Sequence, residues 1–172
     1  MPRDELRHFT DLWDQEARKT VELLESLPTD QYDFRPWKDG RSLGELAWHL
    51  CEVEAYPTYG IQVGSLAVDQ KPPGITRPRE VEALAPGYAR VHGDALIRVR
   101  RLKPEDLGRE LAWFDGTPTR VGEVLWSGVL LHLMHHRGQL VTLARLAGGK
   151  PPGLFGPTRE QTIAMQERMA NQ

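Results

Sequence analysis

LLHLMHHRGQLVTLARL, at residues 130–146, is a strongly apolar helical run that nevertheless carries three histidines. An α-helix turns once every 3.6 residues, so His132 and His136 lie one above the other on the same face. The side chain of His135 points about 100° away from that of His136. Two neutral imidazoles spaced in this way can bind one transition metal together, and we therefore ask whether the chain supplies a third ligand.

The rest of the chain shows helical periodicity in further long segments. Apolar residues recur at three- and four-residue steps, and clusters of proline, glycine and aspartate separate the segments. Ser42 and Glu45 form a capping box that begins the second segment. The long helices are expected at residues 3–27, 42–56, 78–102 and 120–146, with a short C-terminal helix at 158–170.

Two prolines affect the expected helix boundaries. Pro57 is expected to disturb the second helix just after Tyr56, because a proline inside a helix removes a hydrogen bond and clashes with the preceding turn. Pro86 leaves two alternatives, since the third helix either starts near it or kinks there. Residues 60–78 are expected to form a long loop, and residues 111–118 a strand followed by a turn.

Long helical segments without convincing alternating strands predict an all-α fold. We expect an up-and-down four-helix bundle with long connecting loops and a short C-terminal helix. The length of 172 residues favours one domain over residues 1–172.

Composition and charge narrow the functional class. A net charge of −2 and a hydrophobic content of 40% give no sign of a nucleic-acid-binding or membrane-surface protein. No apolar run reaches the length of a membrane span, and the N-terminus lacks the apolar region of a signal peptide. Cys51 is the only cysteine, so no disulfide can form within the chain, and a cytoplasmic location is expected. We expect Cys51 to be a small core residue.

His49 is the best candidate for a third metal ligand. It lies in the middle of the second helix in an apolar setting, and a bundle brings facing helices together around its core. His92 and His135 are competing candidates. The helical angle disfavours His135, and the charged neighbours Arg90 and Asp94 disfavour His92.

Two motifs carry a family resemblance. HLMHHRGQ at residues 132–139 looks like the HxxHHRGQ signature of the DinB/YfiT-like metalloenzyme superfamily. Residues 34–50, which contain FRP and RSLGELAWHL, resemble the second-helix motif in which a histidine is the first ligand. The resemblance spans the first helix to about Pro157 and is weakest beyond it.

This resemblance implies a four-helix bundle that holds a metal through His49, His132 and His136, commonly as a homodimer. Zinc or nickel is the implied metal, although three imidazoles would also suit copper or iron.

Neighbouring side chains are candidates to orient the histidines or to line an access route. Glu45 and Glu52 lie within one helical turn of His49, and Gln139 within one turn of His136, so each could accept a hydrogen bond from an imidazole. Glu45 could instead only cap its helix, and Glu52 could be solvated. Aromatic candidates for the pocket are Trp37, Trp48, Tyr56 and Trp126.

Three hypotheses for function follow. The leading one is a metal-dependent S-transferase acting on a small-molecule substrate with a low-molecular-weight thiol, because the resemblance includes relatives that use mycothiol or bacillithiol. The second is a metal-dependent hydrolase, since a three-histidine metal can also activate water. The third is a non-catalytic, stress-related bundle that binds metal or another protein.

Overall fold

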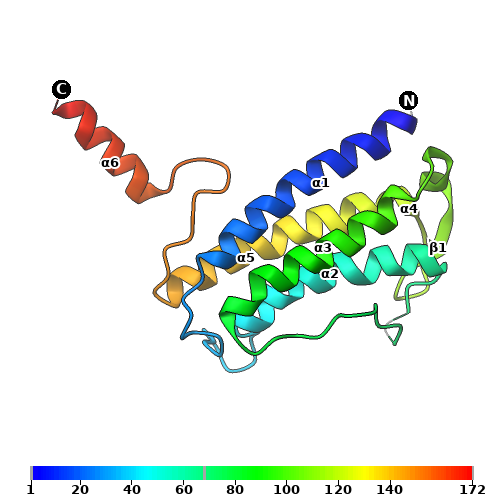
Figure 1. The fold of residues 1–172 in the computed structure, drawn as a ribbon, viewed down its shortest axis with the longest axis horizontal. Coiled ribbons are helices and arrows are strands. Elements are labelled where there is room, and N and C mark those ends of the chain that lie inside the picture. Colours follow the sequence, from blue (N-terminus) through cyan, green and yellow to red (C-terminus); the bar gives the residue numbers. More distant parts are fainter. Residues whose placement is uncertain (1, 68, 172) are drawn as a thin grey trace.

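A computed structural model describes residues 2–67 and 69–171. Four long helices pack side by side as a bundle, which confirms the predicted all-α class (Figure 1). The long helices are α1 (Pro2–Glu25), α2 (Leu43–Val63), α3 (Leu84–Arg100) and a composite last helix, which joins α4 (Val121–Glu123), η3 (Val124–Leu131) and α5 (His132–Leu146). The shorter elements are η1 (Val81–Ala83), η2 (Pro104–Gly108), β1 (Glu110–Ala112), β2 (Pro118–Arg120) and α6 (Arg159–Ala170).

One long connection refines the expected up-and-down order. Trp48 near the start of α2 lies beside Gly87 near the start of α3, and Thr58 of α2 bonds Arg98 towards the end of α3. The two helices therefore run in the same direction. The segment that precedes α3 runs back along the length of the bundle (Figure 1).

Helix α2 does not end near Pro57, as the sequence predicted, but continues to Val63. Pro57 lacks an N–H group, so one helical hydrogen bond is lost. Three of the residues beyond it, Thr58, Gly60 and Ile61, are nevertheless buried. The helix ends at Gly64, which adopts a left-handed conformation with a φ of 86°. Tertiary burial thus outweighs the local cost of the proline.

The alternatives for Pro86 are settled by the start of α3 at Leu84. Pro86 lies in the first turn of the helix, where an N–H group has no helical partner, so the helix needs no kink. The strand expected near residue 111 is present, and β2 pairs with it as an antiparallel hairpin.

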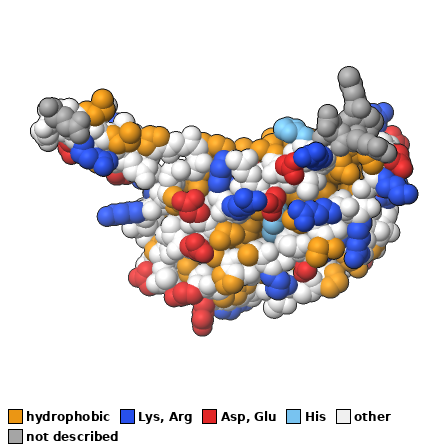
Figure 2. Space-filling view, turned by 45° about the horizontal axis from the view of Figure 1, so that its top comes forward, with side chains coloured by type: hydrophobic (Ala, Val, Ile, Leu, Met, Phe, Trp, Pro, Cys, Tyr) orange, Lys and Arg blue, Asp and Glu red, His pale blue; other side chains and the backbone are white. Residues whose placement is uncertain are grey.

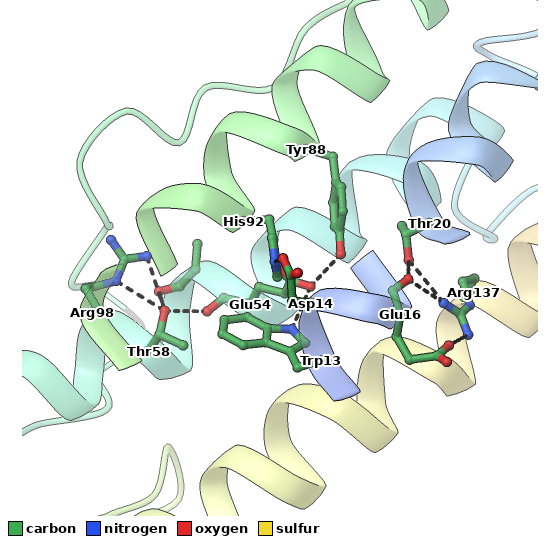
Figure 3. Close-up of polar contacts among 11 residues, drawn as sticks. Trp13, Asp14, Glu16, Thr20, Glu54, Thr58, Tyr88, His92, Arg98 and Arg137 are labelled. Atoms are coloured by element: carbon green, nitrogen blue, oxygen red, sulfur yellow. Dashed lines mark hydrogen bonds and ion pairs between the residues drawn. The ribbon is translucent and has the colours of Figure 1, made fainter. Parts of the chain in front are cut away.

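A buried polar network joins α1, α2 and α3 (Figure 3). The Glu54 carboxylate is fully buried and accepts hydrogen bonds from Trp13 Nε1, at 2.9 Å, and from the Tyr88 hydroxyl. His92 Nδ1 lies 2.8 Å from Glu54 Oε2, and His92 Nε2 lies 3.4 Å from Asp14 Oδ1. His92 is therefore committed to the core between two carboxylates.

Arg137 fixes the rotation of α5 against α1. Its side chain is buried and donates to the Glu16 backbone carbonyl at 2.8 Å, and it also pairs with the Glu16 carboxylate (Figure 3). The positive charge of the neighbouring Lys19, 2.7 Å from Glu16, helps to balance the buried carboxylate. Because Arg137 faces α1, the adjacent His136 is free to face α2.

Helix α6 projects from the bundle as an arm (Figure 2). None of its described residues is buried, and apolar side chains line its surface, among them Met169, which is 75% exposed. A double contact between Arg145 and Glu160, at 2.9 and 3.5 Å, ties its first turn to α5. Among the described residues, no helix is long and apolar enough to cross a membrane.

Candidate metal centre

Three histidines from two helices converge on one point. His49 of α2 meets His132 and His136 of α5, and each offers a ring nitrogen within 4.8 Å of the others. The ring centroid of His49 lies 5.8 Å from that of His132 and 4.6 Å from that of His136. These are the three residues that the sequence predicted as ligands. Of the two competitors, His92 faces the polar core network and His135 lies outside the group.

The inner faces of the two α5 histidines are close and suited to a cation. Nε2 of His132 and Nε2 of His136 lie 2.8 Å apart, the distance of a hydrogen bond in which one ring donates a proton to the lone pair of the other. Burial, together with the charge of His49, lowers the pKa of His132. Burial also lowers the pKa of His136 to about 4, against the opposing effect of the hydrogen bond that His136 donates to Gln139. Both rings are thus neutral at pH 7, the form that binds metals.

The outer nitrogens of two rings are held by hydrogen-bond acceptors. His49 Nδ1 donates to Glu52 Oε2 at 2.8 Å, and His136 Nδ1 donates to Gln139 Oε1 at 2.7 Å. Donation from Nδ1 directs the lone pair of each ring to Nε2. The three-imidazole donor set, with its rings oriented in this way, fits a transition-metal ion.

His135 has a role that was not predicted from the sequence, because it accepts a hydrogen bond from Gln139. The Gln139 amide donates from Nε2 to His135 Nε2 at 3.0 Å, so its oxygen is turned towards His136. His135 therefore orients the side chain that orients His136. The four-residue spacing of His135 and Gln139 is the signal that could have revealed this contact.

Glu45 does not contact His49. Its carboxylate accepts from the Ser42 backbone N–H at 2.9 Å, completing the capping box. Arg35 and Arg77 lie 2.7 and 3.6 Å from its two oxygens. The hydrogen bond from Arg35, followed by that from Ser42, lowers the pKa of Glu45 to about 2. Of the three candidate orienting residues, Glu45 is thus a helix cap, whereas Glu52 and Gln139 bond the histidines.

A hollow of about 490 Å³ opens onto two of the histidines. We call it the aromatic hollow, and it is lined by His49, Glu52, Val53, Tyr56, Pro57, Trp113, Phe114, Gly128 and His132. Tyr56 was predicted at such a position, whereas Trp113 and Phe114 were not. Both come from the hairpin turn after β1, which reaches the site only through the tertiary fold.

The hairpin packs through Trp113 against Gly128, which lies in a π-helical segment. Residues Val124–Leu131 form the π-helix η3 immediately before His132. A Cβ atom on Gly128 would lie only 2.7 Å from the Trp113 ring, so the indole can pack against the helix backbone only because Gly128 lacks a side chain. π-Helical turns occur frequently at functional sites, and here one lies between the hairpin and the histidines.

The three predicted tryptophans lie elsewhere. Trp48 is only 2% exposed and packs in the core against Gly87. Trp126 donates from Nε1 to Glu5 on α1 at 3.2 Å and is absent from the aromatic hollow. Trp37 lines a separate hollow of about 370 Å³ that also includes Gln139. The prediction that Trp48 and Trp126 line a route to the metal was therefore wrong, because packing against α3 and α1 turns them away from the histidines.

Known proteins resemble this chain over most of its length. An uncharacterized protein of Bacillus subtilis, YrdA, is 29% identical over 165 residues, which cover 91% of each chain. A crystal structure of a DinB-like protein from Bacillus cereus superposes with a TM-score of 0.70 at 25% identity, covering 84% of this chain and 94% of that one.

A more distant structure shares only the fold. The mycothiol-dependent maleylpyruvate isomerase superposes with a TM-score of 0.58 at 12% identity, over 78% of this chain and 60% of that protein. The sequence model of the DinB superfamily matches residues 12–140, three quarters of the chain and all three converging histidines. This chain belongs to the DinB superfamily.

Proposed function

We propose that this protein is a metal-dependent enzyme that uses a low-molecular-weight thiol in an S-transfer reaction. The observation that supports it best is the aromatic hollow, which opens directly onto His49 and His132. A metal site with a purely structural role is closed, whereas a catalytic site keeps a position open to a substrate. The three-histidine group here has such an opening.

His49, His132 and His136 would hold the metal, with zinc or nickel as the proposed ion. When bound, such a cation favours the thiolate form of a thiol and so supplies the nucleophile. Glu52 and Gln139 keep two of the imidazoles oriented through their Nδ1 hydrogen bonds. The protein contributes a fixed arrangement of rings before any substrate arrives.

The aromatic hollow would bind the electrophilic substrate. Tyr56, Trp113 and Phe114 present ring faces suited to an apolar or aromatic group. In the transfer step the sulfur forms a bond to the electrophilic carbon, the bond from that carbon to the leaving group breaks, and the leaving group departs with the electron pair. The thiol proton is released to solvent through the open side of the hollow.

The dependence on a thiol has outside support in the mycothiol-dependent isomerase that shares this fold. We place the activity in the cytoplasm, because a free thiol cofactor needs a reducing compartment. We also propose a homodimer, in which a second copy covers the exposed apolar side chains of α6, including Ile163, Met165 and Met169.

The metal assignment is tested by metal analysis of purified protein. His49→Ala and His136→Ala should each lose most of the bound metal, whereas His8→Ala, an exposed histidine on α1, should keep it. Circular dichroism of each variant would show that the fold is retained. Unchanged metal content in both site variants would refute the assignment.

The reaction is tested with a panel of thiols and a chromogenic electrophile. The rate should depend on both the added thiol and the bound metal. Metal-dependent product formation without thiol would instead identify the hydrolase alternative. Full metal occupancy with no turnover of either kind would favour a non-catalytic bundle.

A further inference from the structure

A second hollow lies on the opposite side of the histidine group from the aromatic hollow. We call it the Arg41 hollow; its volume is about 370 Å³, and it is lined by Pro36, Trp37, Arg41, Leu46, Gln139, Thr142, Leu143 and Leu146. Helices α2 and α5 run antiparallel along this seam. Leu46 precedes His49 by one turn, and Gln139 follows His136 by one turn. The seam therefore has two compartments with the histidines between them.

Arg41 provides an uncompensated positive charge in this hollow. Its side chain is exposed and forms no ion pair with any residue in the described ranges. The nearby Glu45 carboxylate is already engaged by Arg35 and Arg77. An anionic group would complement this surface.

Trp37 forms an apolar wall beside that charge. The indole is 66% exposed, yet it is seated on Gly40, where a Cβ atom would lie 2.6 Å from the ring. One side of the indole thus packs against the backbone at Gly40, while the rest of the ring faces solvent. Leu143 and the exposed Leu146 extend the apolar lining. The hollow suits a ligand with an apolar stem and an anionic end.

The length of α5 sets the size of that ligand. Leu143 follows His136 by seven positions, which corresponds to about 10 Å along the helix at 1.5 Å per residue. A ligand with one end at the histidines and the other in the Arg41 hollow must span roughly this distance. Small thiols such as 3-mercaptopropionic acid are too short to do so.

We propose that the Arg41 hollow binds the carboxylate end of an elongated low-molecular-weight thiol whose sulfur lies at the histidine group. The inference rests on the proposed function and adds to it the class of the thiol and the residue that selects it. Arg41 donates hydrogen bonds to the carboxylate, Trp37 covers the stem, and the aromatic hollow is left for the electrophile.

Binding of three simple thiols to the zinc-loaded protein, measured by titration calorimetry, tests this assignment. The 8-mercaptooctanoic acid should bind roughly 2- to 5-fold more tightly than 8-mercaptooctanol, because Arg41 is exposed and an exposed ion pair contributes only about that ratio. The short 3-mercaptopropionic acid should gain no such advantage over its own alcohol. Arg41→Met should abolish the preference for the long acid, and Arg41→Lys should restore part of it.

A matched control is Arg100→Met, which removes an exposed arginine on α3 and should keep the preference. If the long acid and the long alcohol bind equally well, or if Arg41→Met weakens both alike, the inference is wrong whatever the turnover assay gives. If the acid keeps its Arg41-dependent advantage while no thiol supports turnover, the proposed function fails and the binding site stands.

Discussion

His49 is oriented by a charged partner on its own helix. Its Nδ1 donates to Glu52 at 2.8 Å, and the lone pair needed for a metal is thereby directed to Nε2. The side chain of His49 is only 16% exposed, whereas that of Glu52 is 40% exposed. A substitution of Glu52 should therefore change the affinity for a metal even though the three histidines are retained.

We predict that Glu52→Ala lowers metal affinity about 10- to 100-fold, the usual effect of losing a partner that orients a metal ligand. Competition with a chromogenic chelator measures the affinity. Glu45→Ala is the matched control on the same helix: it should destabilise the N-terminus of α2 and leave metal affinity unchanged. Equal losses in both variants would contradict the assigned roles.

Gly128 and Gly138 make a second comparison at the scale of single residues. Gly128→Ala would force a methyl group towards the Trp113 ring, and we predict a loss of roughly 1–3 kcal/mol in the free energy of unfolding from overpacking. Gly138 has nothing within 4 Å of the corresponding position, so Gly138→Ala should gain roughly 0.5–1 kcal/mol from helix propensity. Urea unfolding measures both. A Gly128→Ala protein with unchanged stability and unchanged tryptophan fluorescence would show that the position of the hairpin does not depend on Gly128.

At the scale of elements, the buried network between α1, α2 and α3 couples stability to pH. Burial lowers the pKa of His92, but hydrogen bonds and charges from Glu54 and Asp14 outweigh it, so the pKa is raised overall. The ring faces Trp13 and Asp14 of α1, Glu54 of α2 and Tyr88 of its own helix. The protonated form of His92 is therefore favoured in the folded state.

A group whose pKa is raised on folding contributes stability that is complete below its unfolded pKa, about 6.5 for histidine, and is lost as pH rises through the folded value. We predict that the free energy of unfolding falls as the pH rises above 6.5, through the raised pKa of His92, and that His92→Gln flattens this slope. Urea titrations of metal-free protein at several pH values measure it. His132 and His136 do not interfere in this range, because their lowered pKa values act below pH 6.5. An unchanged slope in the variant would assign the effect to other groups.

Local periodicity predicted the helices well because each one buries a regular apolar face. It could not predict the path of α2 beyond Pro57, since that depends on how Thr58 and Ile61 pack in the core. Nor could it predict η3: the run VLWSGVLL is apolar on all sides, so an α-helix and a π-helix give the same pattern.

One part of the candidate site could be predicted from the sequence, and another part could not. The grouping of His49, His132 and His136 follows from helix geometry and two facing helices, which a sequence contains. The aromatic wall does not, because Trp113 and Phe114 lie in a short hairpin whose position depends on a glycine fifteen residues after the first of them. Contacts between distant segments leave little trace in one sequence.

At the scale of the whole molecule, α6 stands apart from the bundle. None of its described residues is buried, so we predict that removing the chain from Arg159 onward leaves the thermal midpoint of dilute protein nearly unchanged. Light scattering at higher concentration should at the same time show a shift from dimer to monomer, because isolated short helices are marginal unless packed. A dimer that persists without α6 would place the interface elsewhere.

The histidines and the aromatic residues of the hollow lie on different kinds of element, the former on core-forming helices and the latter on the hairpin between α3 and α4. The histidines lie on helices whose opposite faces form the core, so substitutions near them endanger the fold. The turn that carries Trp113 and Phe114 is a surface connection with Gly116 at its tip, where insertions are tolerated. Under the proposed function, a few substitutions in this turn would change the preferred electrophile without altering the three histidines or the helix faces that form the core.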